Sequence, residues 1–313
     1  MDAAEIAHRF GLGRSARLSD QPVARGKQGV VWRLDTSDGR WAVKVPLYPV
    51  QENDIRAAAA FQEAAVRAGI PAPQLRRTVA GSVLAQVHGT QLRVYEWVDL
   101  GGPDPRLDPV MVGSVLATIH VMSESAHGPV ADWYSRPVGA AAWDGLVADL
   151  RDARAPFARR LSDLRDELVA LESWVEPSAE LRTCHRDLWA DNVRPTAAGG
   201  VCVIDWESSG PANQSQELAC VLFEFARSAP HRARALMAAY HDAGGPAEVT
   251  RRGHFSMLIA QLGHIAESAA ATWLHADPGS ADRAEAAAGV EEMLAEPHTR
   301  RVLDELLNAV HDA

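Results

Sequence analysis

Three polar side chains between Cys184 and Trp206 have types and spacing that suit phosphoryl transfer. Asp187 belongs to a His-Arg-Asp triplet, Asn192 follows five positions later, and Asp205 ends an apolar run. Carboxylate and amide oxygens are ligands that Mg²⁺ prefers, and Mg²⁺ also bridges phosphate oxygens. A further carboxylate could orient a hydroxyl and accept its proton. We therefore expect Asn192 and Asp205 to bind Mg²⁺ and Asp187 to act as the base.

The segment that follows Asn192 must bring the two metal ligands together. Val193 begins a short strand, the Gly199-Gly200 pair predicts a turn, and residues 201–204 are rich in β-branched side chains, as in a strand. Folding this hairpin returns Asp205 to the side of Asn192.

The order of these residues resembles the catalytic and metal-binding loops of the protein-kinase-like superfamily. Asp205 is followed by Trp206-Glu207 instead of Phe-Gly, and residues 216–219 (Gln-Glu-Leu-Ala) open a helix soon afterwards. In both details the chain is similar to the aminoglycoside phosphotransferase and choline kinase family of small-molecule kinases. The alternative interpretation is a surface loop with scattered polar residues beside a buried hairpin. The resemblance implies an α+β, bilobal protein-kinase-like fold, with a small N-terminal antiparallel β lobe carrying one helix and a larger, mostly helical C-terminal lobe.

Length and composition set limits on the class of protein. The chain has 313 residues, of which 47 % are apolar, which is enough for two lobes with their own cores. No run of eighteen apolar residues and no basic leader occurs, so we expect a soluble, cytoplasmic protein. Three cysteines in apolar contexts are expected to be reduced core thiols; a reactive Cys184 beside His185 is the alternative.

Charge is distributed unevenly along the chain. Residues 1–97 carry 13 Lys+Arg against 9 Asp+Glu, whereas the remainder carries 18 against 32. Nucleic acid and membranes are therefore not expected partners. The acidic C-terminal part would attract a cationic small molecule, although plain solubilising acidity explains it equally well.

A glycine turn and a lysine strand are expected to bind the nucleotide phosphates. Gly26, Lys27 and Gly29 form a turn that enters a strand, and glycines there let backbone N–H groups approach phosphates. A hairpin signal at residues 35–39 leads to the strand that holds Lys44. Only two of the 31 basic residues are lysines, and the resemblance implies that Lys44 binds the α and β phosphates.

A helix over residues 49–68 and the strand ending near Val98 complete the N-terminal lobe. The resemblance implies a glutamate on this helix that pairs with Lys44; Glu63 is the candidate and Glu52 its rival. It also implies that backbone groups from Glu96 to Val98 bind the base, with adenine and guanine both open. The Asp-Leu-Gly-Gly-Pro break that follows predicts lobes at 1–98 and 99–313.

The C-terminal lobe is predicted to be helical, with helices near 230–243, 249–275 and 281–312, and an irregular segment at 127–156. Glu217 stands where the family usually carries Asp, and Trp189 is bulkier than the residue many relatives have there, so Trp189 could narrow the acceptor site. Candidate acceptor contacts, for each of which a packing or surface role is the preferred interpretation, are Trp133, Tyr134, Trp143, Glu224, His254, His264 and Glu267.

The sequence thus favours a small-molecule O-phosphotransferase that uses Mg²⁺ and ATP or GTP. The acceptor would be an aminoglycoside or another, cationic, antibiotic; a metabolite kinase acting on choline, an amino alcohol or a sugar is the alternative. A protein kinase is disfavoured because no Ala-Pro-Glu motif follows Asp205. A nucleotide-binding pseudokinase scaffold is a further alternative. The sequence does not indicate an oligomeric state.

Overall fold

The computed structural model describes residues 1–26 and 28–311, and contacts divide the chain into two compact units. The first unit consists of residues 1–107 and 187–209, and the second of residues 108–186 and 210–313. The predicted boundary after Val98 lies close to the first division. That prediction, however, gave residues 187–209 to the second lobe, whereas their contacts lie within the first unit.

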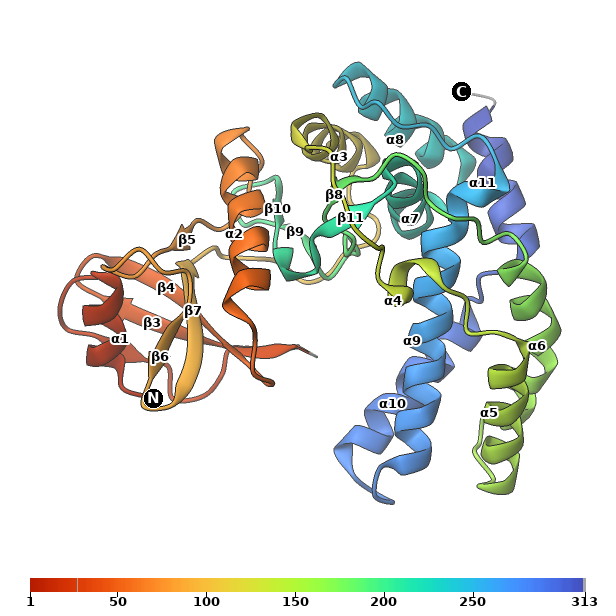
Figure 1. The fold of residues 1–313 in the computed structure, drawn as a ribbon, viewed down its shortest axis with the longest axis horizontal. Coiled ribbons are helices and arrows are strands. Elements are labelled where there is room, and N and C mark those ends of the chain that lie inside the picture. Colours follow the sequence, from red (N-terminus) through yellow and green to blue (C-terminus); the bar gives the residue numbers. More distant parts are fainter. Residues whose placement is uncertain (27, 312–313) are drawn as a thin grey trace. The chain divides into compact units, whose positions relative to one another are not determined.

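The first unit is built on a seven-stranded antiparallel sheet (Figure 1), as expected for the small lobe of an α+β fold. The main path runs β1-β3-β4-β7-β5, with β2 paired to β3 and β6 paired to β7. Its strands are β1 (Arg17–Leu18), β2 (Ala24–Arg25), β3 (Gly29–Thr36), β4 (Gly39–Pro46), β5 (Leu75–Arg76), β6 (Ala85–Val87) and β7 (Thr90–Glu96). The register pairs Lys44 on β4 with Arg93 on β7.

Two helices flank this sheet. Helix α1 (Ala3–Phe10) is capped by the Asp2 side chain and ends at Gly11, whose φ of 61° suits a glycine. Its Ile6 packs into a core with Leu34 of β3 and Leu92 of β7. Helix α2 (Glu52–Arg67) packs instead against β5 and a short 3₁₀ helix, η1 (Trp206–Ser208).

The predicted hairpin after Asn192 is confirmed. Strands β9 (Val193–Pro195) and β10 (Val201–Val203) pair antiparallel, with both turn glycines at positive φ. The Ile204 amide donates to the Asn192 carbonyl at 2.9 Å. This bond brings the residue just before Asp205 against Asn192, as the hairpin predicts.

The second unit is mostly helical. It contains one small antiparallel pair, β8 (Arg182–Cys184) with β11 (Gly210–Ala212), and a 3₁₀ helix η2 (Arg252–Phe255). Its helices are α3 (Pro109–Met122), α4 (Asp132–Ser135), α5 (Ala140–Asp152), α6 (Ala158–Glu172), α7 (Gln214–Ala226), α8 (Pro230–Asp242), α9 (Ser256–His275), α10 (Ala281–Ala295) and α11 (Arg300–His311).

Two sequence expectations for this unit were wrong. The segment expected to be irregular, 127–156, contains α4 and α5. The single helix expected over 281–312 is two helices, because Pro297 lacks an amide hydrogen and its ring collides with the preceding turn.

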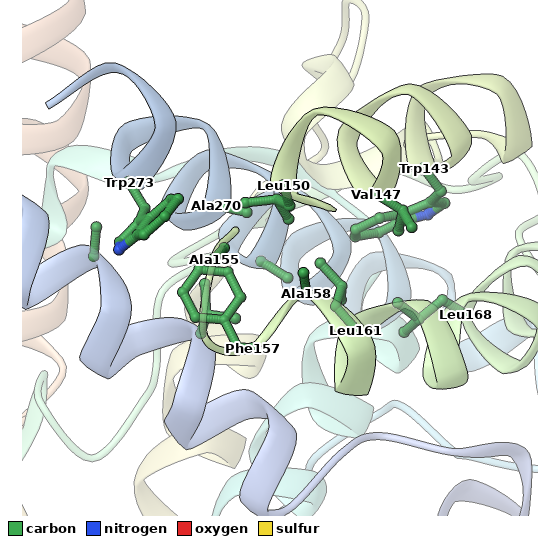
Figure 2. Packing of buried hydrophobic residues seen from close by; sticks show 13 residues of the cluster. Trp143, Val147, Leu150, Ala155, Phe157, Ala158, Leu161, Leu168, Ala270 and Trp273 are labelled. Carbon is green, nitrogen blue, oxygen red and sulfur yellow. The ribbon is translucent and has the colours of Figure 1, made fainter. Parts of the chain in front are cut away.

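Trp143 is a core residue of the second unit. Figure 2 shows its ring packed among apolar side chains of α5 and α6, including Val147 and Leu168. Trp143 is fully buried, and its indole N–H donates to Glu172 at 2.8 Å, which satisfies its one polar atom. Packing thus accounts for Trp143, which was a candidate acceptor contact.

The three cysteines are free and buried, as expected. Burial raises the pKa of the Cys184 thiol well above its usual range, which disfavours the reactive interpretation. Among the described residues, no helix is both long and apolar enough to cross a membrane.

We predict that His298, in the connection between α10 and α11, makes stability depend on pH. The ring is 2 % exposed, and burial lowers its pKa to about 4. Because the neutral form is favoured in the folded state, the stabilisation is complete above the unfolded pKa of about 6.5 and is lost as pH falls toward 4. Between pH 7 and pH 5 the wild type should lose about 2 kcal/mol more unfolding free energy than His298→Gln.

Denaturant titrations at the two pH values measure this difference. His231→Gln, at an exposed position on α8, is the control and should keep the wild-type pH dependence. Equal pH dependence of the wild type and His298→Gln would contradict the prediction.

Candidate active site

Asp187 and Asn192 lie together at the start of the loop that leads into β9. The Asn192 side-chain amide donates both to the Asp187 carboxylate and to the Asp187 carbonyl, each at 2.8 Å. Both hydrogens of the amide nitrogen are therefore used, and its oxygen remains as the acceptor or ligand atom.

Burial changes the proton affinity of Asp187. Removal from water raises the pKa of Asp187 to about 6, although the Asn192 hydrogen bond and the nearby Lys44 charge oppose this shift. A carboxylate with a pKa near 6 is still ionised at neutral pH and is a stronger proton acceptor than an ordinary aspartate.

Lys44 contacts two carboxylates of the segment that follows β10. Its ammonium nitrogen lies 2.6 Å from Asp205 Oδ1 and 3.0 Å from Glu207 Oε1. The side chains are largely withdrawn from solvent, with 13 % of Lys44 and 14 % of Glu207 exposed. Burial raises the pKa of Asp205, as does the adjacent Glu207 carboxylate, whereas Lys44 opposes both.

Glu207, Arg93 and Tyr95 were missed as site residues from the sequence. Glu207 Oε1 accepts a charged hydrogen bond from Arg93 at 2.6 Å, and the Tyr95 hydroxyl lies 3.3 Å away. Burial alone would raise the pKa of Glu207, but Lys44 and Arg93 hold it well below its usual range. The available signal was alternation along β7, which places residues 93 and 95 on one face.

The expected pairing of Glu63 with Lys44 is not the arrangement in the structure. Glu63 lies near the end of α2 and makes a two-bond ion pair with Arg77, at 2.8 and 2.9 Å. The rival, Glu52, bonds Arg56 and Ser82. The physical reason is that each of the two carboxylates pairs with an arginine instead of Lys44, Glu63 with Arg77 and Glu52 with Arg56.

The glycine turn joins β2 to β3. The Gly26 amide donates to the Gly29 carbonyl at 2.9 Å, and a Cβ on Gly29 would lie 2.8 Å from the Val45 carbonyl oxygen. Gly29 is therefore required by the close approach of β3 and β4. Lys27 lies outside the described residues.

The segment expected to contact the nucleotide base has its first two amides engaged. The Glu96 amide donates to the Gln74 carbonyl at 2.8 Å and the Trp97 amide to the Arg40 carbonyl at 3.1 Å. This leaves the Val98 amide as the candidate donor from the predicted segment.

Backbone strain marks both ends of the segment 187–205. Arg186 has a φ of 66° and Asp205 a φ of 60°, conformations that non-glycine residues adopt only when their surroundings compel them. Asp205 thereby turns its side chain out of β10 at the point where η1 begins.

Within the second unit, the Arg186 peptide is clamped from two sides. Its amide donates to Glu217 Oε1 at 2.5 Å, and its carbonyl accepts from Gln261 at 2.9 Å. The other Glu217 oxygen lies 2.9 Å from His120 Nε2, and His120 Nδ1 lies 2.7 Å from the Tyr240 hydroxyl. Glu217 therefore orients the backbone that leads directly into Asp187, so the extra methylene relative to Asp is accommodated.

The remaining acceptor candidates are distributed over the second unit. Trp133 is 40 % exposed and stacks on His264 with ring centroids 5.4 Å apart, and His264 also bonds Glu267. Tyr134 lies under the Arg186 guanidinium at 4.2 Å. The other two make local contacts: Glu224 with Arg227, and His254 with the Thr250 amide.

We predict that Glu217→Ala destabilises the protein far more than Glu217→Gln. Alanine removes the carboxylate that accepts from the Arg186 amide and contacts the His120 ring, at a cost of about 2–4 kcal/mol in unfolding free energy. Glutamine can still accept from the amide and can donate to the other His120 tautomer, so its cost should be about 1 kcal/mol. Denaturant unfolding measures both, with exposed Glu248→Gln as the control. Equal losses for Ala and Gln would show that the negative charge, and not the hydrogen bonds, matters.

Residues 20–254 match the model of the phosphotransferase enzyme family (APH). No curated protein matches the sequence.

Among solved structures, the fold is similar to spectinomycin phosphotransferase APH(9)-Ia in complex with ADP and spectinomycin, with a TM-score of 0.68 and 14 % identity over 99 % of this chain and 98 % of that one. It is also similar to an aminoglycoside phosphotransferase from Alicyclobacillus acidocaldarius, with a TM-score of 0.60 and 19 % identity over 97 % and 96 % of the two chains. A choline/ethanolamine kinase family protein from Mesorhizobium loti gives a TM-score of 0.54 and 18 % identity over 96 % and 94 %.

The family match spans well over half of the chain, and its neighbours in structure have kinase-like phosphotransferase folds. The chain therefore belongs to the phosphotransferase enzyme family.

Proposed function

We propose that the protein transfers the γ-phosphoryl group of ATP or GTP to a hydroxyl of a cationic small molecule, with Asp187 as the base. The observation that carries this proposal is the convergence of Lys44, Asp187, Asn192 and Asp205 within the first unit. Such a set provides a phosphate-binding cation, a proton acceptor and two oxygen ligands, and phosphoryl transfer relies mainly on positioning and charge stabilisation.

The oxygen donors at this site fit Mg²⁺. Asn192 spends its amide hydrogens on Asp187 and keeps its oxygen, and the Asp205 carboxylate already contacts a cation, the Lys44 ammonium. Asn192 and Asp205 would hold the metal, which when bound would neutralise charge on the nucleotide phosphates. Complexes of relatives support a nucleotide donor, since one contains ADP and an amicoumacin kinase was solved with AMP-PNP and Ca²⁺.

The remaining nucleotide contacts follow from the first unit. Lys44 would bind the α and β phosphates, the Gly26–Gly29 turn, with Lys27, would present backbone donors, and Val98 would donate to the base. Glu96 would contribute its carbonyl only, because its amide is engaged. We propose no such role for Glu63, since Arg77 occupies its carboxylate.

For the acceptor, a cationic antibiotic is the first candidate. The excess of 32 acidic over 18 basic residues beyond position 97 favours an amine-bearing molecule. Relatives are described as spectinomycin, amicoumacin and macrolide kinases, which supports this class. Choline and ethanolamine kinases of the same fold keep a cationic metabolite as the second candidate. Free, buried cysteines support a cytoplasmic location.

We predict that Asp187→Asn abolishes transfer without weakening nucleotide binding. The amide cannot accept the hydroxyl proton, so kcat should fall by about 10²–10⁴-fold. The assay incubates protein, Mg²⁺ and ATP or GTP with aminoglycosides, other antibiotics, choline and sugars, and detects the product by mass and by nucleoside diphosphate release. Asp191→Asn, an exposed neighbour in the same loop, is the matched control and should retain wild-type turnover.

Wild-type turnover by Asp187→Asn would overturn the assignment of the base. Nucleotide binding with no acceptor phosphorylated in a broad panel would favour a scaffold.

A further inference from the structure

Two carboxylates contact Lys44, and the less exposed of the two belongs to Glu207, in the segment after Asp205. Glu207 is 14 % exposed, lies 3.0 Å from the Lys44 ammonium, and makes an ion pair with Arg93 at 2.6 Å. The Tyr95 hydroxyl adds a third contact at 3.3 Å. One carboxylate therefore joins two strands of the sheet to the segment that carries Asp205.

The strand register explains why an acid is needed at this position. Lys44 on β4 and Arg93 on β7 are directly paired, so two cations stand side by side in a largely buried environment. Like charges opposite each other in a sheet are destabilising, and buried charges need partners. A carboxylate in contact with both cations removes the repulsion and fixes the direction of the lysine side chain.

Helix α2 supplies no carboxylate to this position among its described side chains. It lines the small cavity beside Glu207 with Ile55, Ala58, Ala59 and Gln62. Its glutamates are engaged elsewhere, Glu52 with Arg56 and Glu63 with Arg77. The Glu207, Arg93 and Tyr95 side chains line the same cavity, so the alanines of α2 face them without offering a polar group.

We propose that Glu207 is a positioning residue that holds Lys44 in the pose required to bind the nucleotide phosphates, in place of a glutamate on helix α2. This inference rests on the proposed function, because it assigns Lys44 to the phosphates. Glu207 also lies two residues from Asp205, so both acids that contact Lys44 belong to one turn. Trp206, between them, packs against Phe61 of α2 with ring centroids 5.5 Å apart.

The test measures nucleotide binding without Mg²⁺ and without acceptor. The affinity for ADP is measured by calorimetric titration in a chelating buffer for the wild type, Glu207→Gln and Glu63→Gln. The two variants each lose one negative charge from the first unit. We expect Glu207→Gln to bind ADP about tenfold more weakly or worse, because a charged hydrogen bond to the lysine is lost. Glu63→Gln should remain within about twofold of the wild type, because exposed ion pairs contribute little.

A double-mutant cycle tests whether Glu207 acts through Lys44. If it does, Lys44→Ala/Glu207→Gln should bind ADP no more weakly than Lys44→Ala alone. In turnover, Glu207→Gln should raise KM for the nucleotide while KM for the acceptor stays unchanged. Glu207→Asp keeps the charge but is too short to span both cations, so it should also weaken ADP binding and serves if Glu207→Gln does not fold.

Three results would overturn the proposal. Glu63→Gln could weaken ADP binding as much as Glu207→Gln does. The two effects in the cycle could simply add. The loss could occur only when Mg²⁺ is present, which would make Glu207 a metal ligand. If instead the wild type bound no nucleotide at all, the proposed function itself would fail.

Discussion

The ion pairs of Lys44 with Asp205 and Glu207 are the interaction on which the first unit depends. A buried ammonium is tolerated only when acids surround it, and the same holds for buried acids. These contacts tie β4 to the turn after β10, two elements separated by more than half of the chain. Through the β9–β10 hairpin, this turn is also bonded to Asn192, and Asn192 is bonded to Asp187. The candidate site residues thus form one connected network within the first unit.

The backbone is strained at both ends of the segment that carries Asp187, Asn192 and Asp205. Arg186 and Asp205 both have left-handed φ values, which cost free energy unless the surroundings enforce them. At Arg186, the amide donates a hydrogen bond to Glu217 and the carbonyl accepts one from Gln261, all within the second unit. At Asp205, the surroundings are the hairpin and the lysine contact. The hydrogen bonds of the hairpin and the ion pair with Lys44 offset the cost of this backbone conformation at Asp205.

From the sequence, we could propose those parts of the candidate site that local patterns bring together. Asp187, Asn192 and Asp205 could be placed because hairpin signals determine their separation, and Lys44 could be placed because it follows a turn and a second hairpin. The partner of Lys44 could not be predicted, because it depends on contacts between side chains that are far apart in the sequence. Lys44 and Asp205, for example, are 161 residues apart. Glu63 pairs with Arg77 instead of Lys44. Glu207 is the third residue of the Asp205-Trp206-Glu207 sequence, and nothing in that sequence indicated a contact between Glu207 and Lys44. We did not predict the break between α10 and α11, although Pro297 between them is a helix-breaking residue.

The central claim is that Lys44, Asn192 and Asp205 bind the phosphates and the metal of a nucleotide while Asp187 is left for the acceptor. A crystal structure with Mg²⁺ and a non-hydrolysable ATP analogue tests it most directly. We expect a metal ion bound by the Asn192 and Asp205 side-chain oxygens, the Lys44 ammonium within hydrogen-bonding distance of the α or β phosphate, and the Asp187 carboxylate free of metal. A nucleotide bound elsewhere, or a metal ion held by Asp187 instead of Asp205, would contradict it.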